Sequence, residues 1–246
     1  MQLAIDTSTA WSSIALMDGE RAVASDEMHG VNPGDAVVSR IDQLLRGVDV
    51  GRESLTGIVV GVGPGPYTST RIGVAIARTL GFALGLEVAG VCSHDAVAAQ
   101  FVGEYPEVAA DDFIVATDAR RREVYWARYD GEGRRQVGPT VGKPAEVVAA
   151  YEYDSFVGNG LDRYPELAAD AGITIYQPSH PSARWVAAVA AAALDGGQAI
   201  PTTQPVLADH AAGSSLPFDR GQRLFAPFPL YLRRPDAVPS AGGASR

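Results

Sequence analysis

The sequence predicts an α/β protein of two lobes that share one order of elements: three strands, a helix, a strand, a helix, a strand and a helix. Two observations carry this prediction. Short apolar runs bounded by turn residues alternate with longer segments of helical periodicity, and the whole series occurs twice in the 246 residues. A chain of this length is long enough to bury two cores.

The first lobe is predicted over residues 1–103. Its opening apolar run is a buried-type strand, and Asp18-Gly19 turns the next two runs into a hairpin. Residues 35–46 are predicted to be helical because their apolar positions fall on one face. In order, the predicted elements are strands at 2–5, 12–17 and 21–28, a helix at 35–46, a strand at 57–62, a helix at 68–84, a strand at 87–91 and a helix at 93–101.

The second lobe is predicted over residues 111–196, and it repeats details of the first as well as its order. Asp6 and Asp118 each close the first strand of their lobe, and the glycine break at 61–65 has a counterpart at 158–160. The predicted elements are strands at 113–117, 124–129 and 135–141, a helix at 144–151, a strand at 155–157, a helix at 161–171, a strand at 173–176 and a helix at 182–194. Residues 197–246 lack this periodicity and are predicted to be an irregular segment, with a short anchored stretch at 229–234 and a disordered tail at 238–246.

Composition and charge exclude several classes of protein. Hydrophobic residues make up 46% of the chain and charged residues 20%, as in ordinary globular proteins. No apolar run approaches the ~20 residues that cross a bilayer, and the start lacks the basic region of a signal peptide. We therefore expect a cytoplasmic protein that does not bind a membrane. The net charge of −9 argues against independent binding of nucleic acid, which requires a basic surface.

Four segments resemble the TsaB (YeaZ) family along essentially the whole chain. They are Leu3-Ala4-Ile5-Asp6-Thr7-Ser8-Thr9, Gly61-Val62-Gly63-Pro64-Gly65-Pro66-Tyr67-Thr68-Ser69-Thr70-Arg71-Ile72-Gly73, Asp118-Ala119-Arg120-Arg121-Arg122-Glu123-Val124-Tyr125-Trp126-Ala127 and Pro229-Leu230-Tyr231-Leu232-Arg233. The chain departs from the family at Asn32-Pro33-Gly34, where relatives often carry a histidine, and at Ser69, where a glycine is common.

The resemblance implies the duplicated ribonuclease H-like fold of the actin, hexokinase and Hsp70 ATPase superfamily. It also implies a non-catalytic subunit that pairs with a TsaD-type homologue, which modifies the adenosine beside the anticodon of tRNA to N6-threonylcarbamoyladenosine. A TsaE-type ATPase would join the complex, and tRNA would be reached only through it. A homodimer of the free chain stays open, as does direct contact with tRNA.

Asp6, Thr7, Ser8 and Asp118 are the candidates for a vestigial nucleotide cleft. The first three would supply a carboxylate and hydroxyls to a hydrated cation and a phosphate. After Asp118, however, the second loop continues with Ala119 and three arginines, Arg120 to Arg122, and it contains no glycine that would let its backbone approach a phosphate. We therefore expect no cofactor of the free chain, with residual binding of ATP or ADP only within a complex.

The segment with Gly63, Pro64, Gly65 and Thr68 invites comparison with a phosphate-binding loop. It lacks the Gly-Lys-Ser/Thr ending that supplies charge and a magnesium ligand, so we interpret it as a strand-to-helix turn in which Thr68 caps the helix. The histidines are scattered without paired spacing, so neither a metal site nor a catalytic residue is predicted. The alternative is an active kinase or metallopeptidase-like hydrolase of the same superfamily.

The helices at 35–46 and 68–84 are the predicted partner surface. The longer one is apolar around most of its circumference, so it must be covered on more than one side. Small residues at every fourth position, Gly73, Ala77 and Gly81, form a stripe that would let another helix approach closely. The predicted contact residues are Val37, Ile41, Leu44, Leu45, Arg71, Ile72, Ala75, Ile76 and Thr79.

Overall fold

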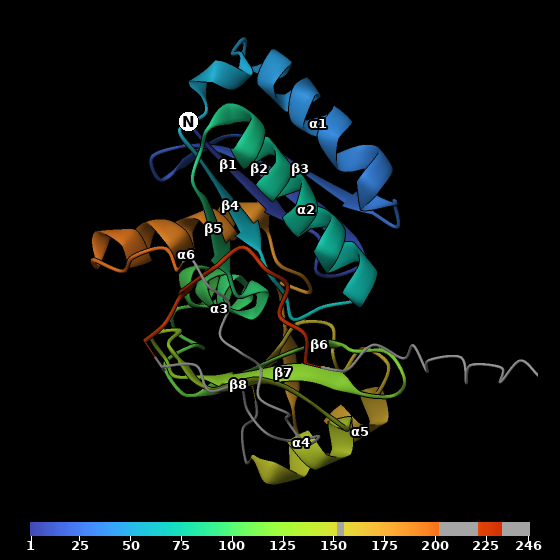
Figure 1. Cartoon of the computed structure of the whole chain (residues 1–246). Helices are drawn as coiled ribbons and strands as arrows, with labels where there is room; N and C mark the ends of the chain where they lie inside the picture. The colour runs from blue at the N-terminus through green and yellow to red at the C-terminus, as the bar shows by residue number, and fades with distance from the viewer. Residues whose placement is uncertain (152–154, 202–220, 233–246) are drawn as a thin grey trace, which may run out of the picture.

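The computed structural model describes residues 1–151, 155–201 and 221–232. Within them the predicted order of elements occurs in both halves, and the α/β prediction is confirmed (Figure 1). The first half contains β1 (Gln2–Asp6), β2 (Trp11–Asp18), β3 (Arg21–His29), α1 (Pro33–Gly47), β4 (Gly57–Gly61), α2 (Tyr67–Leu84), β5 (Val88–Val91) and α3 (Ser93–Glu104). The second contains β6 (Phe113–Asp118), β7 (Val124–Tyr129), β8 (Arg135–Gly142), α4 (Pro144–Ala150), β9 (Ser155–Val157), α5 (Pro165–Asp170), β10 (Thr174–Tyr176) and α6 (Ala183–Asp195).

Each half builds one mixed sheet of the same design. The first sheet has the order β11-β5-β4-β1-β2-β3, in which β11 is Leu224–Phe225, and the second has the order β10-β9-β6-β7-β8. In both, the first strand pairs in parallel with the strand after the first helix and antiparallel with its hairpin neighbour. The predicted duplication is therefore present in the pairing of the strands as well as in their order.

Two helices form a layer between the sheets, and each packs on the sheet of the other half (Figure 1). Helix α3 follows the first sheet but buries Val97 and Phe101 against the second, beside Phe113 and Tyr129. Helix α6 follows the second sheet but packs against the first, where Val186 and its neighbours bury Val59 and Val91. The predicted lobes at residues 1–103 and 111–196 thus place α6 in a different lobe from the sheet that it covers.

The outer faces carry the other helices. α1 and α2 cover the first sheet, with Val37, Ile41 and Val74 in the largest apolar cluster. α4 and α5 cover the second sheet. Helix α5 is shorter than predicted because Pro165 takes its first position, where a proline has no intrahelical hydrogen bond to lose. None of the described helices combines the length and the apolar character needed to span a bilayer.

The segment after residue 196 is not wholly irregular, contrary to prediction. Residues Leu224–Phe225 form β11, which pairs antiparallel with β5 at the edge of the first sheet. Leu230 is then buried in the first core, and its N–H donates to the Val62 carbonyl at 2.7 Å. The chain therefore returns to the first lobe before residue 233, where the described part ends; the predicted tail lies outside it.

Candidate interaction site around helix α2

The residues predicted to line a nucleotide cleft are sealed inside the first lobe. Asp6, Thr7 and Ser8 are each at most 1% exposed. Asp6 accepts hydrogen bonds from the hydroxyls of Ser8 at 2.7 Å and Ser93 at 2.6 Å, and from the Ser8 N–H at 2.8 Å. Burial raises the pKa of the Asp6 carboxyl, and these hydrogen bonds partly offset that rise. A carboxylate enclosed in this way is not open to a hydrated cation.

Three glycines close the space above Asp6, Thr7 and Ser8. A Cβ at Gly61 would collide with the Asp6 carboxylate, one at Gly65 with the Ser8 carbonyl, and one at Gly73 with the Thr7 hydroxyl. The backbone of β4, of the following turn and of α2 therefore rests directly on the segment that would hold a phosphate. The chain's own backbone therefore fills the space beside these three side chains.

Replacing Gly65 with alanine tests this packing. The new Cβ would meet the backbone of Ser8, which cannot rotate away as a side chain could, so we expect the free energy of unfolding to fall by about 1–3 kcal/mol. Gly47→Ala at the end of α1 is the matched control, because its Cβ would meet nothing within 4 Å. Urea denaturation should leave the control at or slightly above wild type; equal midpoints for the two variants would contradict the close contact.

The predicted cap and stripe have different roles from those expected. Helix α2 begins at Tyr67, with Pro66 at the cap position and no side-chain cap, so Thr68 does not cap it. Gly73, Ala77 and Gly81 are all buried, and a Cβ at Gly81 would collide with Val88 of β5. The small residues let α2 approach the chain's own loops and strands, and they are not available to a partner helix.

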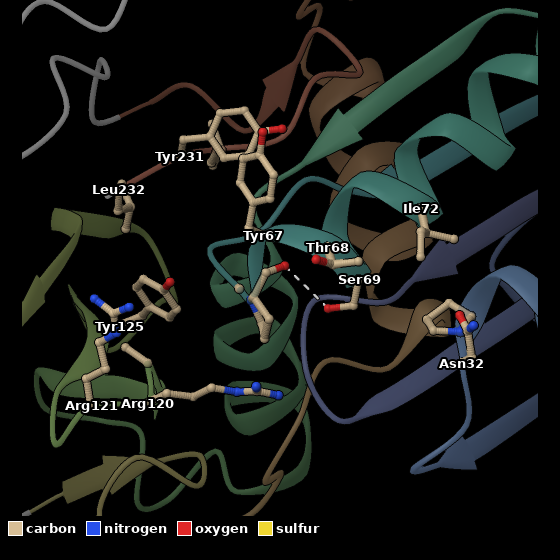
Figure 2. Close-up of a pocket in the computed structure, with 15 residues that line it drawn as sticks. Asn32, Tyr67, Thr68, Ser69, Ile72, Arg120, Arg121, Tyr125, Tyr231 and Leu232 are labelled. Carbon is tan, nitrogen blue, oxygen red and sulfur yellow. Dashed lines mark hydrogen bonds between the residues drawn. The ribbon is translucent and has the colours of Figure 1, made fainter. Parts of the chain in front are cut away.

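The second loop departs from the predicted cleft as well. Asp118 is half-buried, and its Oδ1 accepts the N–H of Arg120 at 2.8 Å. Arg120, Arg121 and Arg122 have φ values of 58°, 53° and 61°, a left-handed conformation that residues other than glycine seldom adopt. This turn carries the side chain of Arg120 toward the start of α2 (Figure 2).

A pocket of about 560 Å³ lies where this turn faces the start of α2 and the returning C-terminal segment (Figure 2). Its lining residues are Asn32, Pro33, Gly65, Pro66, Tyr67, Thr68, Ser69, Ile72, Ala119, Arg120, Arg121, Tyr125, Leu230, Tyr231 and Leu232. Asp6, Thr7, Ser8 and Asp118 are not among them. Gly65 and Thr68, predicted only as parts of a turn, do line it, whereas Gly63 and Pro64 are buried behind.

Helix α2 also presents an exposed face beyond this pocket. Arg71, Ala75 and Thr79, predicted as contact residues, are exposed, and Ile72, Ile76 and Leu44 are half-buried. The contact prediction is wrong for Val37, Ile41 and Leu45, which are at most 3% exposed and pack on the sheet beneath α1. Their apolar stripe was correctly seen, but it faces the chain's own core.

At the buried start of α3, the side chains of His94 and Asp95 contact residues of the second lobe. His94 Nε2 lies 2.8 Å from Thr117 Oγ1, while Asp95 binds Arg135 at 3.0 Å and the Tyr129 hydroxyl at 2.7 Å. Burial, reinforced by the negative charge of Asp95, raises the pKa of the Cys92 thiol to about 12. Among the described residues, no three histidine, cysteine or acidic side chains gather as a metal site.

Similarity to known proteins now places the chain in a family. A family model described as TsaD, tRNA N6-adenosine threonylcarbamoyltransferase, matches residues 34–192. The TsaB protein of Escherichia coli K12, a tRNA threonylcarbamoyladenosine biosynthesis protein, is 28% identical over 181 residues, which span 70% of this chain and 77% of that one. The solved structure of YeaZ from Pseudomonas aeruginosa superimposes with a TM-score of 0.68 at 28% identity, covering 80% of this chain and 92% of its own. The chain belongs to the TsaB (YeaZ) family.

One further relative is named only as an uncharacterized protein. A protein of Mycobacterium tuberculosis strain H37Rv is 36% identical over 248 residues, covering 97% of this chain and 94% of that one. The similarity therefore runs nearly end to end and includes the returning segment after β11.

Val38 on α1 and Phe82 on α2 are exposed apolar residues that the sequence did not predict as contact residues. Phe82 is 93% exposed and Val38 42%. Phe82 follows Ala75 and Thr79 on the same face of α2, at the i+7 and i+3 positions that helix geometry aligns. That spacing was available in the sequence, but the apolar positions on the other faces of α2 obscured it.

The buried imidazole of His94 predicts that the stability of the fold falls at acid pH. Burial, reinforced by the positive charge of Arg135, lowers the pKa of the imidazole from 6.5 to about 3. Because the unfolded chain binds this proton below pH 6.5 and the folded chain does not, stability is full above pH 6.5 and is lost as the pH falls toward 3. At pH 5 the loss attributable to His94 is about 2 kcal/mol, from ~1.4 kcal/mol per pH unit.

Urea unfolding of wild type and His94→Gln at pH 7 and pH 5 measures this loss. We expect the wild type to lose more stability than the variant between the two values, because glutamine does not titrate. Parallel losses would show that other groups account for the acid sensitivity.

Proposed function

We propose that this chain is a non-catalytic scaffold subunit that binds a TsaD-type homologue and so supports formation of N6-threonylcarbamoyladenosine beside the anticodon of tRNA. The names of its relatives in E. coli and Bacillus subtilis, both tRNA threonylcarbamoyladenosine biosynthesis proteins, support the pathway. A role beside tRNA would place the chain in the cytoplasm.

The observation that carries the scaffold proposal is the contrast between a sealed first loop and an exposed α2 face. Asp6, Thr7 and Ser8 are enclosed by β4, the turn and α2, so the chain lacks an open phosphate loop there. A phenylalanine that is 93% exposed on a regular helix is a site that a protein partner would cover. Catalysis by the partner, with the scaffold bound through α1 and α2, accounts for both.

Size-exclusion chromatography with light scattering tests the proposal. The chain would be run alone, mixed with the TsaD-type protein of the same organism, and mixed again with the TsaE-type ATPase and nucleotide. A stable complex with one copy of each homologue is the expected result. A homodimer that dissociates when the TsaD-type protein is added would mean that both species use one surface.

The alternative functions predict other results from the same purified chain. An active kinase would bind nucleotide tightly and turn it over, and a metallopeptidase-like hydrolase would contain stoichiometric metal. Absence of any complex, together with nucleotide turnover by the chain alone, would overturn the scaffold proposal. In that case the pocket at the start of α2 becomes the first place to search for a substrate.

A further inference from the structure

The pocket at the start of α2 is locally positive in an acidic protein. Two of its lining residues, Arg120 and Arg121, are cationic, and none is aspartate or glutamate, although the whole chain has a net charge of −9. Figure 2 shows Arg120 extending from its loop toward the segment that begins α2. Two hydrogen bonds fix the backbone of Arg120: its N–H donates to the Asp118 carboxylate, and its carbonyl accepts from the Glu123 N–H.

The opposite wall adds polar donors and apolar surface. Thr68 and Ser69 line the pocket, where the Ser69 hydroxyl donates to the Pro66 carbonyl at 3.3 Å, and α2 starts there without a side-chain cap. N–H groups of its first turn therefore lack intrahelical partners. Pro33, Ile72 and Leu230 supply apolar contacts. A short aliphatic stem that ends in an anion matches such a lining.

The pocket is continuous with the exposed face of α2. Tyr67 and Ile72 line the pocket and lie on the first turns of the helix whose later turns expose Ala75 and Phe82. Arg71 is held beside the rim, because its Nη1 donates to the Tyr67 hydroxyl at 2.6 Å and its guanidinium lies 4.8 Å from the Tyr67 ring centre. A protein that lies along α2 would also cover this rim.

We propose that the partner which covers α2 inserts a carboxylate side chain into this pocket, where Arg120 binds it. The inference rests on the proposed function and adds a chemical requirement to it. The partner must present an aspartate or glutamate at the start of α2, about the length of that helix away from the residue that covers Phe82. Charge complementarity would then set the register of the two proteins, since a displaced partner would leave its acid unpaired.

Arg120→Glu and Arg122→Glu make a matched pair that tests this proposal. Both arginines are exposed in the same loop with nearly equal φ values, but only Arg120 lines the pocket. The dissociation constant for the TsaD-type protein would be measured by calorimetry at low and moderate salt. We expect Arg120→Glu to weaken binding at least tenfold and Arg122→Glu less than threefold, and reversing the partner's acid to a basic residue should restore the Arg120→Glu complex.

The outcomes separate this inference from the proposed function. If the wild-type proteins do not pair, the proposed function fails. If they pair and the two variants bind equally well, the complex stands and the carboxylate proposal is wrong. Saturable binding of inorganic phosphate or ATP by the chain alone, lost in Arg120→Glu while pairing is unchanged, would assign the pocket to a small anion and overturn the proposal as well.

Discussion

Phe82→Glu is expected to abolish pairing with the TsaD-type homologue while leaving the fold intact. The side chain is 93% exposed, so its replacement removes almost no packing from the chain's own core. In a complex the same ring would be the largest apolar side chain on the α2 face, and central aromatic residues contribute most of the binding energy at interfaces. Insertion of a carboxylate there adds the cost of burying a charge.

The measurement is the dissociation constant, with circular dichroism to confirm the fold. We expect Phe82→Ala to weaken binding by roughly 30-fold or more, equivalent to about 2 kcal/mol, and Phe82→Glu or Ala75→Glu to leave no detectable complex. Val108→Glu is the control, because Val108 is also an exposed apolar residue, at 37%, but lies in the segment between α3 and β6. Wild-type affinity in a folded Phe82→Glu protein would move the interface elsewhere.

Asp95→Ala is expected to cause the largest loss of stability of any substitution considered. Asp95 on α3 and Arg135 on β8 form an ion pair whose side chains are 3% and 4% exposed. Arg135 also donates to the Gln222 carbonyl at 2.8 Å, so it ties the helix layer, the second sheet and the returning C-terminal segment together. Removal of the carboxylate leaves the buried guanidinium without its Asp95 partner, so we expect the free energy of unfolding to fall by about 3–5 kcal/mol.

Urea denaturation with a matched exposed pair checks this expectation. Asp42 and Arg52 make a closer contact than the buried pair, 2.7 Å against 3.0 Å, but at the surface, with side-chain exposures of 30% and 54%. Asp42→Ala should therefore cost less than about 1 kcal/mol. The double variant Asp95→Leu with Arg135→Leu should recover part of the loss, because it removes both charges. Equal effects of Asp95→Ala and Asp42→Ala would contradict the role of the buried pair.

The alternation of strands and helices was readable from the sequence because each element carries its own periodicity. The helix at 68–84 is one residue shorter than α2, and the strands at 124–129 and 155–157 match the structure at both ends. The hydroxyl of Ser93 shows the limit of such reasoning. Sequence position suggests a helix cap, yet the hydroxyl donates to Asp6, 87 residues earlier in the chain, and Cys92 takes the cap position.

The candidate site was less readable because exposure depends on contacts distant in sequence. The periodicity of α1 identified Val37, Ile41 and Leu45 as an apolar stripe, but it could not say whether the sheet or a partner covers that stripe. Gly73 and Gly81 are small because Thr7 and Val88 lie against them, and these contacts join residues that are distant in sequence or separated by a turn. The pocket combines residues from four separate stretches of chain, which no local pattern joins.

The exchange of α3 and α6 between the sheets bears on how the protein is made. A ribosome that has released β1 to β5 has exposed a sheet with one outer face covered by α1 and α2 and the other bare, because α6 comes only at Ala183–Asp195. The pairing partner of the edge strand β5, β11 at Leu224–Phe225, is synthesised later still. The amino-terminal half therefore cannot complete its fold during synthesis until nearly the whole chain has emerged, and a chain released early leaves an apolar sheet face open to chaperones and proteases.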